Sequence, residues 1–367
     1  MIEDFNEKIF RKKHCIRVSK NSNKKVLLVG NFLSKTINYR GMCEDLAVKL
    51  EDSGWQVITT SGQLNRFLRL IDMIRTTWSQ RSRYHVAQVD VYSGLSFFWA
   101  ETVCWILRLL KKPYVLTLRG GNLPSFSMRW PGRVRRLLES SNAVTVPSRY
   151  LQEKMCHYRN DIRLIPNAID LEAYSFRLRE RVFPHLVWLR AFHEIYNPTL
   201  APKILAKISK EFPDARLIMV GPDKGDGSFQ KTQQLAVELG VNDRITFPGV
   251  IQKKDVPVWL NKGDIFLNTT NVDNAPVSIL EAMASGLCIV STNVGGIPYL
   301  LEHEHDALLV APKNLPAMTN AVRRILTEAG LAERISSNAR KKAEEFHWSI
   351  IVPQWDLLLK SGAECLK

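Results

Sequence analysis

This chain lacks several patterns that mark common classes of protein. Its six cysteines have no paired spacing, which argues against zinc sites and disulfide frameworks and favours reduced thiols. They are Cys15, Cys43, Cys104, Cys156, Cys288 and Cys365. No apolar run reaches the length that crosses a membrane, and no apolar segment precedes a cleavage site near the N-terminus. We therefore expect a cytoplasmic protein.

Motifs of three functional classes are also missing. No GxGxxG is present, which counts against an oxidoreductase with a dinucleotide fold, and no GxSxG elbow supports Ser-His-Asp catalysis. Zinc-finger spacing, a basic zipper and RNA-binding aromatic motifs are absent as well. We therefore expect no nucleic acid as a partner, although the net charge is +15.

The length and the apolar pattern predict two α/β domains. A chain of 367 residues exceeds the size at which single cores stop growing. Segments of strand length alternate with helical patterns in both halves, which favours parallel sheets. The strands are expected at 26–30, 56–61, 86–92, 114–118, 143–148, 186–190, 216–221, 244–249, 265–270, 287–292 and 307–310. The densely charged segment Asp170–Pro184 ends at proline and predicts the hinge.

The segment that follows residue 264 carries the clearest chemistry. Its pattern predicts a strand, an acidic loop that bears Asp273, and a helix that begins near Pro276, contains Glu281 and ends at Gly286. In open parallel sheets the ligand lies beyond the carboxyl ends of the strands, where free N–H groups of a helix attract phosphate. A sugar nucleotide offers a diphosphate for these N–H groups and hydroxyls for the two carboxylates.

Seven segments, taken in order, resemble the retaining GT-B glycosyltransferases related to sucrose synthase. The signature of that family is two glutamates separated by seven residues, as Asp273 and Glu281 are here. The segments are GNFLS (30–34), TLRGGNLPSF (117–126), VPSRYLQEKM (146–155), IPNAIDLEAY (165–174), LRAFHEIYNP (189–198), MVGPDKGDGS (219–228) and NVDNAPVSILEAMASG (271–286). The resemblance implies two Rossmann-like, doubly wound lobes that face a cleft. Residues 1–180, completed by a C-terminal helix over 350–367, would bind the acceptor, and residues 181–349 the donor.

The resemblance also assigns roles at the donor site. Arg190 matches the arginine that grips the diphosphate, which suits a guanidinium fork. Asp273 would hold hydroxyls of the donor sugar, and Glu281 those of the ribose. Arg119 stands where many relatives have a histidine that contacts the sugar, so it would meet phosphate or an acidic acceptor instead, or would mark impaired catalysis. Arg190, Asp273 and Arg119 are thus the expected catalytic residues.

Further donor contacts are expected around these residues. The backbone N–H groups of Ala275, Val277 and Ser278 would add donors at the helix terminus. Glycines after strands allow backbone to approach a ligand closely. The expected donor-binding residues therefore also include Gly120, Gly121, Gly221 and His193. The donor would be a UDP- or GDP-sugar, and no metal is expected because cations of the protein stabilise the diphosphate in this family.

Two further features distinguish this chain from its relatives. Asp273 replaces the leading glutamate, and Ile195 stands where the family commonly has a phosphate-binding lysine, so that His193 or Lys224 would have to replace that cation. Two alternatives to a transferase therefore stay open: a nucleotide-sugar epimerase of the same fold, and a non-catalytic paralogue that only binds nucleotide sugars. Arg119, which replaces a histidine, favours the non-catalytic paralogue, and so does Ile195.

Charge is distributed unevenly along the chain. Residues 1–182 hold 31 Lys and Arg against 16 Asp and Glu, whereas residues 183–367 hold 20 of each. A basic acceptor lobe suits an acidic acceptor, or an anionic membrane leaflet at the inner membrane face that carries a lipid-linked acceptor. The acceptor would be a glycan, a lipid-linked saccharide or a small molecule. Segment 63–83 has Leu64, Phe67, Leu68, Ile71, Ile74 and Trp78 at helical spacing with arginines between them. This pattern fits a core-facing helix with a basic outer face or an interfacial membrane helix.

Overall fold

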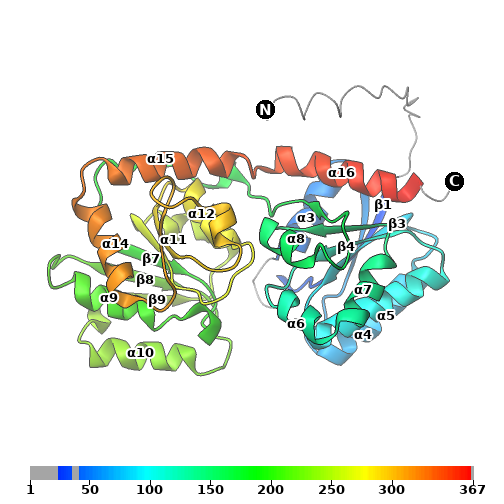
Figure 1. Cartoon of the computed structure of the whole chain (residues 1–367), viewed down its shortest axis with the longest axis horizontal. Helices are drawn as coiled ribbons and strands as arrows, with labels where there is room; N and C mark the ends of the chain where they lie inside the picture. The colour runs from blue at the N-terminus through cyan, green and yellow to red at the C-terminus, as the bar shows by residue number, and fades with distance from the viewer. Residues whose placement is uncertain (1–23, 35–40, 365–367) are drawn as a thin grey trace.

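The computed structural model describes residues 24–34 and 41–364, which form two lobes with one six-stranded parallel sheet each (Figure 1). In the first lobe the strand order is β2-β1-β3-β4-β5-β6. Its strands are β1 Lys25–Val29, β2 Gln56–Thr60, β3 Val86–Val91, β4 Tyr114–Leu118, β5 Ala143–Val146 and β6 Arg163–Leu164. Its helices are α3 Met42–Asp52, α4 Arg66–Ser79, α5 Leu95–Leu109, α6 Leu123–Arg129, α7 Pro131–Glu139 and α8 Arg149–Met155.

The second lobe has the strand order β12-β11-β10-β7-β8-β9. Its strands are β7 His185–Leu189, β8 Arg216–Val220, β9 Ile245–Gly249, β10 Ile265–Asn268, β11 Cys288–Thr292 and β12 Leu308–Val310. Its helices are α9 Leu200–Ile208, α10 Ser228–Glu238, α11 Val256–Leu260, α12 Val277–Ala284, α13 Ile297–Leu300, α14 Leu315–Thr327 and α15 Leu331–Glu344. Short 3-10 helices are η1 Leu171–Ala173, η2 Glu194–Tyr196, η3 Asn242–Arg244 and η4 Lys253–Asp255.

Both sheets are covered by helices on both faces, which explains why their strands are almost continuously apolar. Along β7, Leu186 and Trp188 belong to the core under α9 and α14, whereas Val187 between them belongs to the core under α12 and α15. The same alternation occurs along β1, where Leu27 and Val26 lie in different cores. The predicted α/β class with two doubly wound parallel sheets is therefore confirmed.

The last described helix belongs to the first lobe. After α15 on the second lobe, helix α16 (Trp348–Glu364, red in Figure 1) runs along the first lobe and packs against α3. Its buried residues Ile351, Trp355 and Leu358 share a core with strand β1. The indole N–H of Trp55 donates a hydrogen bond of 2.9 Å to the Asp356 carboxylate on α16. Helix α16 thus completes the core of the first lobe.

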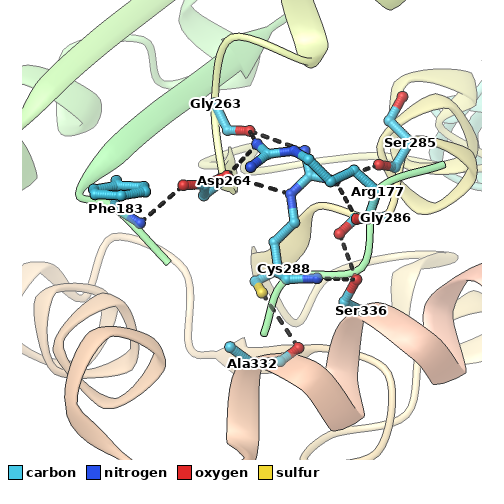
Figure 2. A network of polar contacts seen from close by, with 10 residues as sticks. Arg177, Phe183, Gly263, Asp264, Ser285, Gly286, Cys288, Ala332 and Ser336 are labelled. Carbon is cyan, nitrogen blue, oxygen red and sulfur yellow. Dashed lines mark hydrogen bonds and ion pairs between the residues drawn. The ribbon is translucent and has the colours of Figure 1, made fainter. Parts of the chain in front are cut away.

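The charged connection between the lobes is bound to the second lobe over much of its length. Arg179 is fully buried, and its guanidinium donates to the backbone carbonyls of Gly263 (3.0 Å) and Ser285 (2.6 Å). Arg177 pairs with Asp264, whose carboxylate also accepts from the Phe183 N–H (Figure 2). The charges that predicted a hinge therefore attach this part of the connection to the loops that precede β10 and β11.

The structure corrects one expectation about a helix face. The apolar residues of α4 were compatible with a core-facing helix, but Phe67, Ile71 and Trp78 are exposed, while Arg69 and Thr77 are buried. Helix α5 packs one side against β3, and its opposite side is open to solvent. Helical periodicity shows that one face is apolar, but it does not show whether that face meets the sheet.

Four of the six cysteines and most of the expected helices lie in the part of the chain that the structure describes. Cys43, Cys104, Cys156 and Cys288 are free thiols, and all except Cys156 are buried. The remaining two cysteines lie outside the described residues. Within the described ranges, no helix combines the length and the hydrophobicity that a membrane span requires.

Candidate donor site

The topology of the second sheet locates a ligand site before any side chain is considered. From the centre of the sheet, the strands follow one another as β7, β8 and β9 towards one edge and as β10, β11 and β12 towards the other. The order reverses between the neighbouring strands β7 and β10. In such sheets ligands bind beyond the carboxyl ends of the two strands at the reversal. Arg190 directly follows β7, and Asp273 lies in the loop that follows β10. Two residues predicted from the sequence therefore lie at this point.

Arg190 and Asp273 are in direct contact. The guanidinium of Arg190 forms an ion pair with the Asp273 carboxylate, and the exposed fractions of the two side chains are only 16% and 10%. The guanidinium carbon also lies 4.8 Å from the centre of the Tyr196 ring, a geometry that holds an arginine by cation–π attraction. The pair brings one positive and one negative group together where electrostatic interactions are weakly screened.

Glycines give the backbone around this pair its close contacts. At Gly221, which follows β8 with φ of +148°, a side chain would place its Cβ only 1.8 Å from the carbonyl oxygen of Arg190. At Gly295 and Gly296 a Cβ would lie 1.9 Å from the Asp273 carbonyl oxygen and 1.7 Å from the Asn274 carbonyl oxygen. The N–H of Gly296 donates to the Asp273 carbonyl at 3.0 Å. No other residue type fits these three positions without moving the backbone of Arg190, at Gly221, or the acidic loop, at Gly295 and Gly296.

Helix α12 begins immediately after the acidic loop. Pro276 occupies its N-cap position, so the amides of Val277 and Ser278 belong to the first turn, where N–H groups have no partner within the helix. Ala275 lies just before the cap, and its carbonyl accepts a hydrogen bond of 2.9 Å from the side chain of Asn167 in the first lobe. The first turn of α12 thus adjoins Asp273, as the sequence predicted.

Glu281 lies one turn further along α12 and is buried. Its carboxylate accepts a hydrogen bond of 2.9 Å from the Tyr174 hydroxyl. Burial raises the pKa of Glu281 above its usual value, and the nearby Lys253 ammonium opposes that rise. Lys253 itself pairs with Asp45 on α3 of the first lobe. A buried carboxylate with one hydroxyl donor has unused acceptor capacity, which suits the two hydroxyls of a ribose.

Arg119 follows β4 and has protein partners. Its Nε donates to the Asp90 carboxylate at 3.0 Å, and its Nη1 donates to the Asn167 side chain at 2.9 Å. Burial alone would lower the pKa of Arg119, but the Asp90 charge raises it above the ordinary value. Because Asn167 also binds the Ala275 carbonyl, Arg119 is linked through one residue to the loop that bears Asp273. Direct contact of Arg119 with phosphate stays a prediction.

Other residues of the first lobe touch the same loop. A Cβ on Gly121 would lie 3.6 Å from the Cβ of Asn274, so the Gly120–Gly121 turn is packed against the acidic loop. The hydroxyl of Ser148, the N-cap of α8, donates to the Asn274 side chain. The carboxyl edges of the two sheets therefore meet at this loop.

His193 lies nearby in a structural role. It is the N-cap of η2, where its Nδ1 accepts from the Ile195 N–H at 3.2 Å and lies 3.8 Å from the Asp226 carboxylate. Lys224, the other candidate for the missing cation, is exposed. The lysine next to Glu281 is instead Lys253, which the sequence did not indicate because it stands in an ordinary polar KKD triplet.

The sequence also missed Asn167, Ser148 and Tyr174 as partners of the acidic loop and of α12. All three belong to segments that carried the family resemblance, IPNAIDLEAY and VPSRYLQEKM, so their position in those segments was an available signal. Their partners lie 107 to 126 residues away along the chain, and local patterns do not report such pairings.

Comparison with known proteins agrees with this geometry. A family profile described as "Glycosyl transferases group 1" matches residues 184–342, and one described as "Glycosyltransferase Family 4" matches residues 43–173. The chain belongs to the group 1 glycosyltransferases. Its fold is similar to that of sucrose-phosphate synthase from Thermosynechococcus elongatus, with a TM-score of 0.79, 18% identity, and coverage of 92% of this chain and 98% of that one. The fold is therefore GT-B.

Three further similar proteins have a named activity or a bound nucleotide. The D-inositol 3-phosphate glycosyltransferase of Mycobacteroides abscessus is 29% identical over 251 residues, which are 64% of this chain and 54% of that protein. The N-acetyl-alpha-D-glucosaminyl L-malate synthase of Bacillus anthracis is 26% identical over 61% of each chain. Anabaena HepE, solved with UDP and glucose, has a TM-score of 0.73, 17% identity, and coverage of 92% of this chain and all of its own. This chain thus spans less than two thirds of the length of the Mycobacteroides abscessus and Bacillus anthracis relatives.

Proposed function

We propose that this glycosyltransferase family member moves a sugar from a nucleoside-diphosphate sugar to an acceptor, with retention of anomeric configuration. The observation that carries the proposal is the Arg190–Asp273 pair, which lies at the strand-order reversal of the second sheet and beside the first turn of α12. A diphosphate needs fixed positive charge and free N–H donors, and a sugar ring needs a carboxylate for its hydroxyls. These groups come from the loops that follow β7 and β10 and from the start of α12.

Each group has a separate task in this proposal. Arg190 and the α12 amides bind the diphosphate and stabilise the charge that develops as the bond to the sugar breaks. Asp273 orients the sugar through its hydroxyls, and Glu281 binds the ribose. The acceptor oxygen then attacks the face of the sugar that the leaving diphosphate occupied, which retains the configuration. Lys253, near Glu281, supplies the second cation in place of the lysine that Ile195 replaces.

The donor is proposed to carry UDP or GDP. HepE structures contain UDP and UDP-glucose, and a Mycobacterium tuberculosis relative, 23% identical, is named as a GDP-mannose-dependent mannosyltransferase. We propose that Arg190, Lys253 and the helix terminus neutralise the diphosphate without a metal ion. The acceptor is proposed to be a glycan or a lipid-linked saccharide held by the basic first lobe.

A donor-hydrolysis assay tests the transfer. The chain is incubated with a panel of UDP- and GDP-sugars, and released nucleotide and free sugar are followed by chromatography and NMR. We expect slow hydrolysis of one donor that initially yields sugar of the donor's own anomeric configuration. Asp273→Asn should abolish hydrolysis, whereas Asp214→Asn, an exposed aspartate before β8 at the opposite edge of the sheet, should not.

The other outcomes decide between the alternatives. Binding of a donor without any release of nucleotide would identify a non-catalytic paralogue, which the exposed Ile195 side chain favours. Conversion of the donor into its epimer would identify an epimerase. Inverted sugar as the first product would contradict the retaining mechanism while leaving sugar transfer intact.

A further inference from the structure

The outer helices of the first lobe expose an unusual number of large apolar side chains. Eleven of them lie between residues 64 and 130. They are Leu64, Phe67, Leu68, Ile71 and Trp78 at α4, Leu95, Phe98, Trp105 and Leu109 on α5, and Met128 and Trp130 at the α6–α7 junction. We refer to the outer surface of α4, α5, α6 and α7 as the helical face. Single exposed apolar residues are common on proteins, but a cluster of this size marks an interaction surface.

The exposure follows the geometry of the helices. Leu95, Phe98, Trp105 and Leu109 recur at three-, seven- and four-residue steps, which places them on one side of α5, opposite the buried Phe97. Helix α4 buries Arg69, Met73 and Thr77, while its aromatic residues Phe67 and Trp78 are exposed. No contact within the described chain explains why the apolar side of either helix faces outwards.

These helices form one continuous layer. Helix α4 packs against α5, and α6 packs against α7. Arg133 on α7 pairs with Glu101 on α5, and its guanidinium carbon lies 5.4 Å from the centre of the Phe97 ring. Figure 1 shows α4, α5 and α7 side by side along the outer edge of the first lobe. A pocket of about 310 Å³ between α5 and α7 is lined by Trp105, Arg108 and Arg136, among other residues.

The charge on this layer is almost entirely positive. Between residues 64 and 139 nine basic side chains are exposed, against one exposed acidic side chain, Glu139. The basic residues are Arg66, Arg75, Arg81, Arg83, Arg108, Lys111, Arg129, Arg135 and Arg136. None of the nine forms an ion pair with a carboxylate in the part of the chain that the structure describes. Their charge is therefore available to an anionic partner.

We infer that the helical face docks this protein on the surface of an anionic phospholipid bilayer. Arginines between aromatic and aliphatic side chains match a membrane interface, where apolar groups enter the acyl boundary and cations meet lipid phosphates. Arg75 shows the arrangement on a single helix, because it lies between Ile71 and Trp78 on α4. The attachment is peripheral and reversible, and it goes beyond the proposed sugar transfer without depending on it.

The location of the helical face relates it to the candidate donor site. Helix α6 begins two residues after Gly121, which packs against Asn274 in the acidic loop. Helix α6 therefore connects the turn at the junction of the lobes with Met128 and Trp130 of the helical face. If the proposed function holds, a membrane-borne acceptor would reach the junction along this route.

Flotation of the full chain with vesicles tests the inference. Vesicles of phosphatidylcholine alone are compared with vesicles that contain phosphatidylglycerol, over a series of salt concentrations. We expect binding to the anionic vesicles at low salt, a steep fall as salt is raised, and little binding to neutral vesicles at any salt, because screening shortens the reach of surface charge. Equal binding to both kinds of vesicle, or no binding to either, would overturn the inference.

Paired variants locate the contact. The exposed substitutions Phe98→Ser with Trp105→Ser, and separately Arg75→Glu with Arg136→Glu, should each lower the vesicle partition coefficient by about tenfold or more. The tryptophan fluorescence of the unaltered chain should shift to the blue on binding, and the shift should be smaller in the first pair. Unaltered thermal unfolding and nucleotide affinity would show that both pairs are folded.

A control pair on the second lobe completes the test. Val237→Ser on α10 with Arg334→Glu on α15 removes an exposed apolar residue and reverses an exposed charge of the same kinds. This pair should bind vesicles as the unaltered chain does. An equal loss of vesicle binding in the control pair would show that binding depends on the net charge of the chain and not on the helical face. Concentration-dependent dimers that the helical-face variants abolish, without vesicle binding, would assign the face to a second copy of the chain instead.

Discussion

Replacement of Arg190 by alanine provides the sharpest test of the diphosphate grip. The side chain is 16% exposed, pairs with Asp273 and stacks on Tyr196, so its guanidinium is held in place at the strand-order reversal. A hydrogen bond to a charged group contributes about 1.5 to 3 kcal/mol. Loss of the guanidinium should therefore raise the dissociation constant for the nucleoside diphosphate roughly 10- to 150-fold.

Titration calorimetry with UDP and GDP measures this effect directly. Arg216→Ala is a matched control, because Arg216 is an exposed arginine that pairs in register with His185, at the amino end of the same strands. It should leave the affinity unchanged. Arg190→Lys should recover part of the binding, since it keeps the charge but loses the planar fork.

Folding must be checked in parallel, because Arg190→Ala leaves the Asp273 carboxylate without its cation. Thermal unfolding with a single cooperative transition, near that of the unaltered chain, establishes that the variant is folded. An unchanged dissociation constant in a folded Arg190→Ala protein would remove this residue from the site. An equal loss of affinity in Arg216→Ala would refute the reasoning that places the site at the carboxyl ends of the strands.

Further predictions concern the carboxylates and the last helix. Asp273→Asn should reduce transfer far more than nucleotide binding, and Glu281→Gln should weaken binding itself; an equal loss in both assays for both variants would show that the roles are misassigned. Because burial raises the pKa of Glu281, the ligand-free protein should lose stability as pH rises from about 4.5 through the raised value, and denaturant titrations of Glu281→Gln should show a smaller loss. Deletion from Ser349 onwards removes most of α16 and should expose the core beside Trp55; a truncated chain that stays monodisperse and equally compact by small-angle scattering would contradict this.

Much of the fold follows from local sequence. Apolar runs that alternate with helical patterns predict most of the strands because both faces of a parallel sheet are buried. The exception is β6, which has only two residues and too little length to show a pattern. The positions of Arg190 and Asp273 were also predictable, since both follow strands at the reversal of the sheet order.

Features that depend on distant residues were not predictable. Lys253 and Asp45 are 208 residues apart, and their pairing depends on how the lobes meet. Arg179 stands in a densely charged segment that reads as a solvated linker, yet it is buried because backbone carbonyls and Asp264 satisfy its guanidinium. The orientation of α4 was not predictable for another reason. Its periodicity fits both a core-facing and an interfacial helix, and only the structure shows that Phe67, Ile71 and Trp78 face solvent.

Hydrogen exchange with and without a nucleoside diphosphate tests the central claim most directly. At a ligand concentration of a hundred times its dissociation constant, binding should stabilise the fold by about 2.7 kcal/mol. The account predicts additional protection of the amides at 190–196, 221–228 and 271–281, which are the strand ends and the start of α12. Protection confined to other segments, such as α5 and α7, or the absence of any nucleotide-dependent protection, would contradict it.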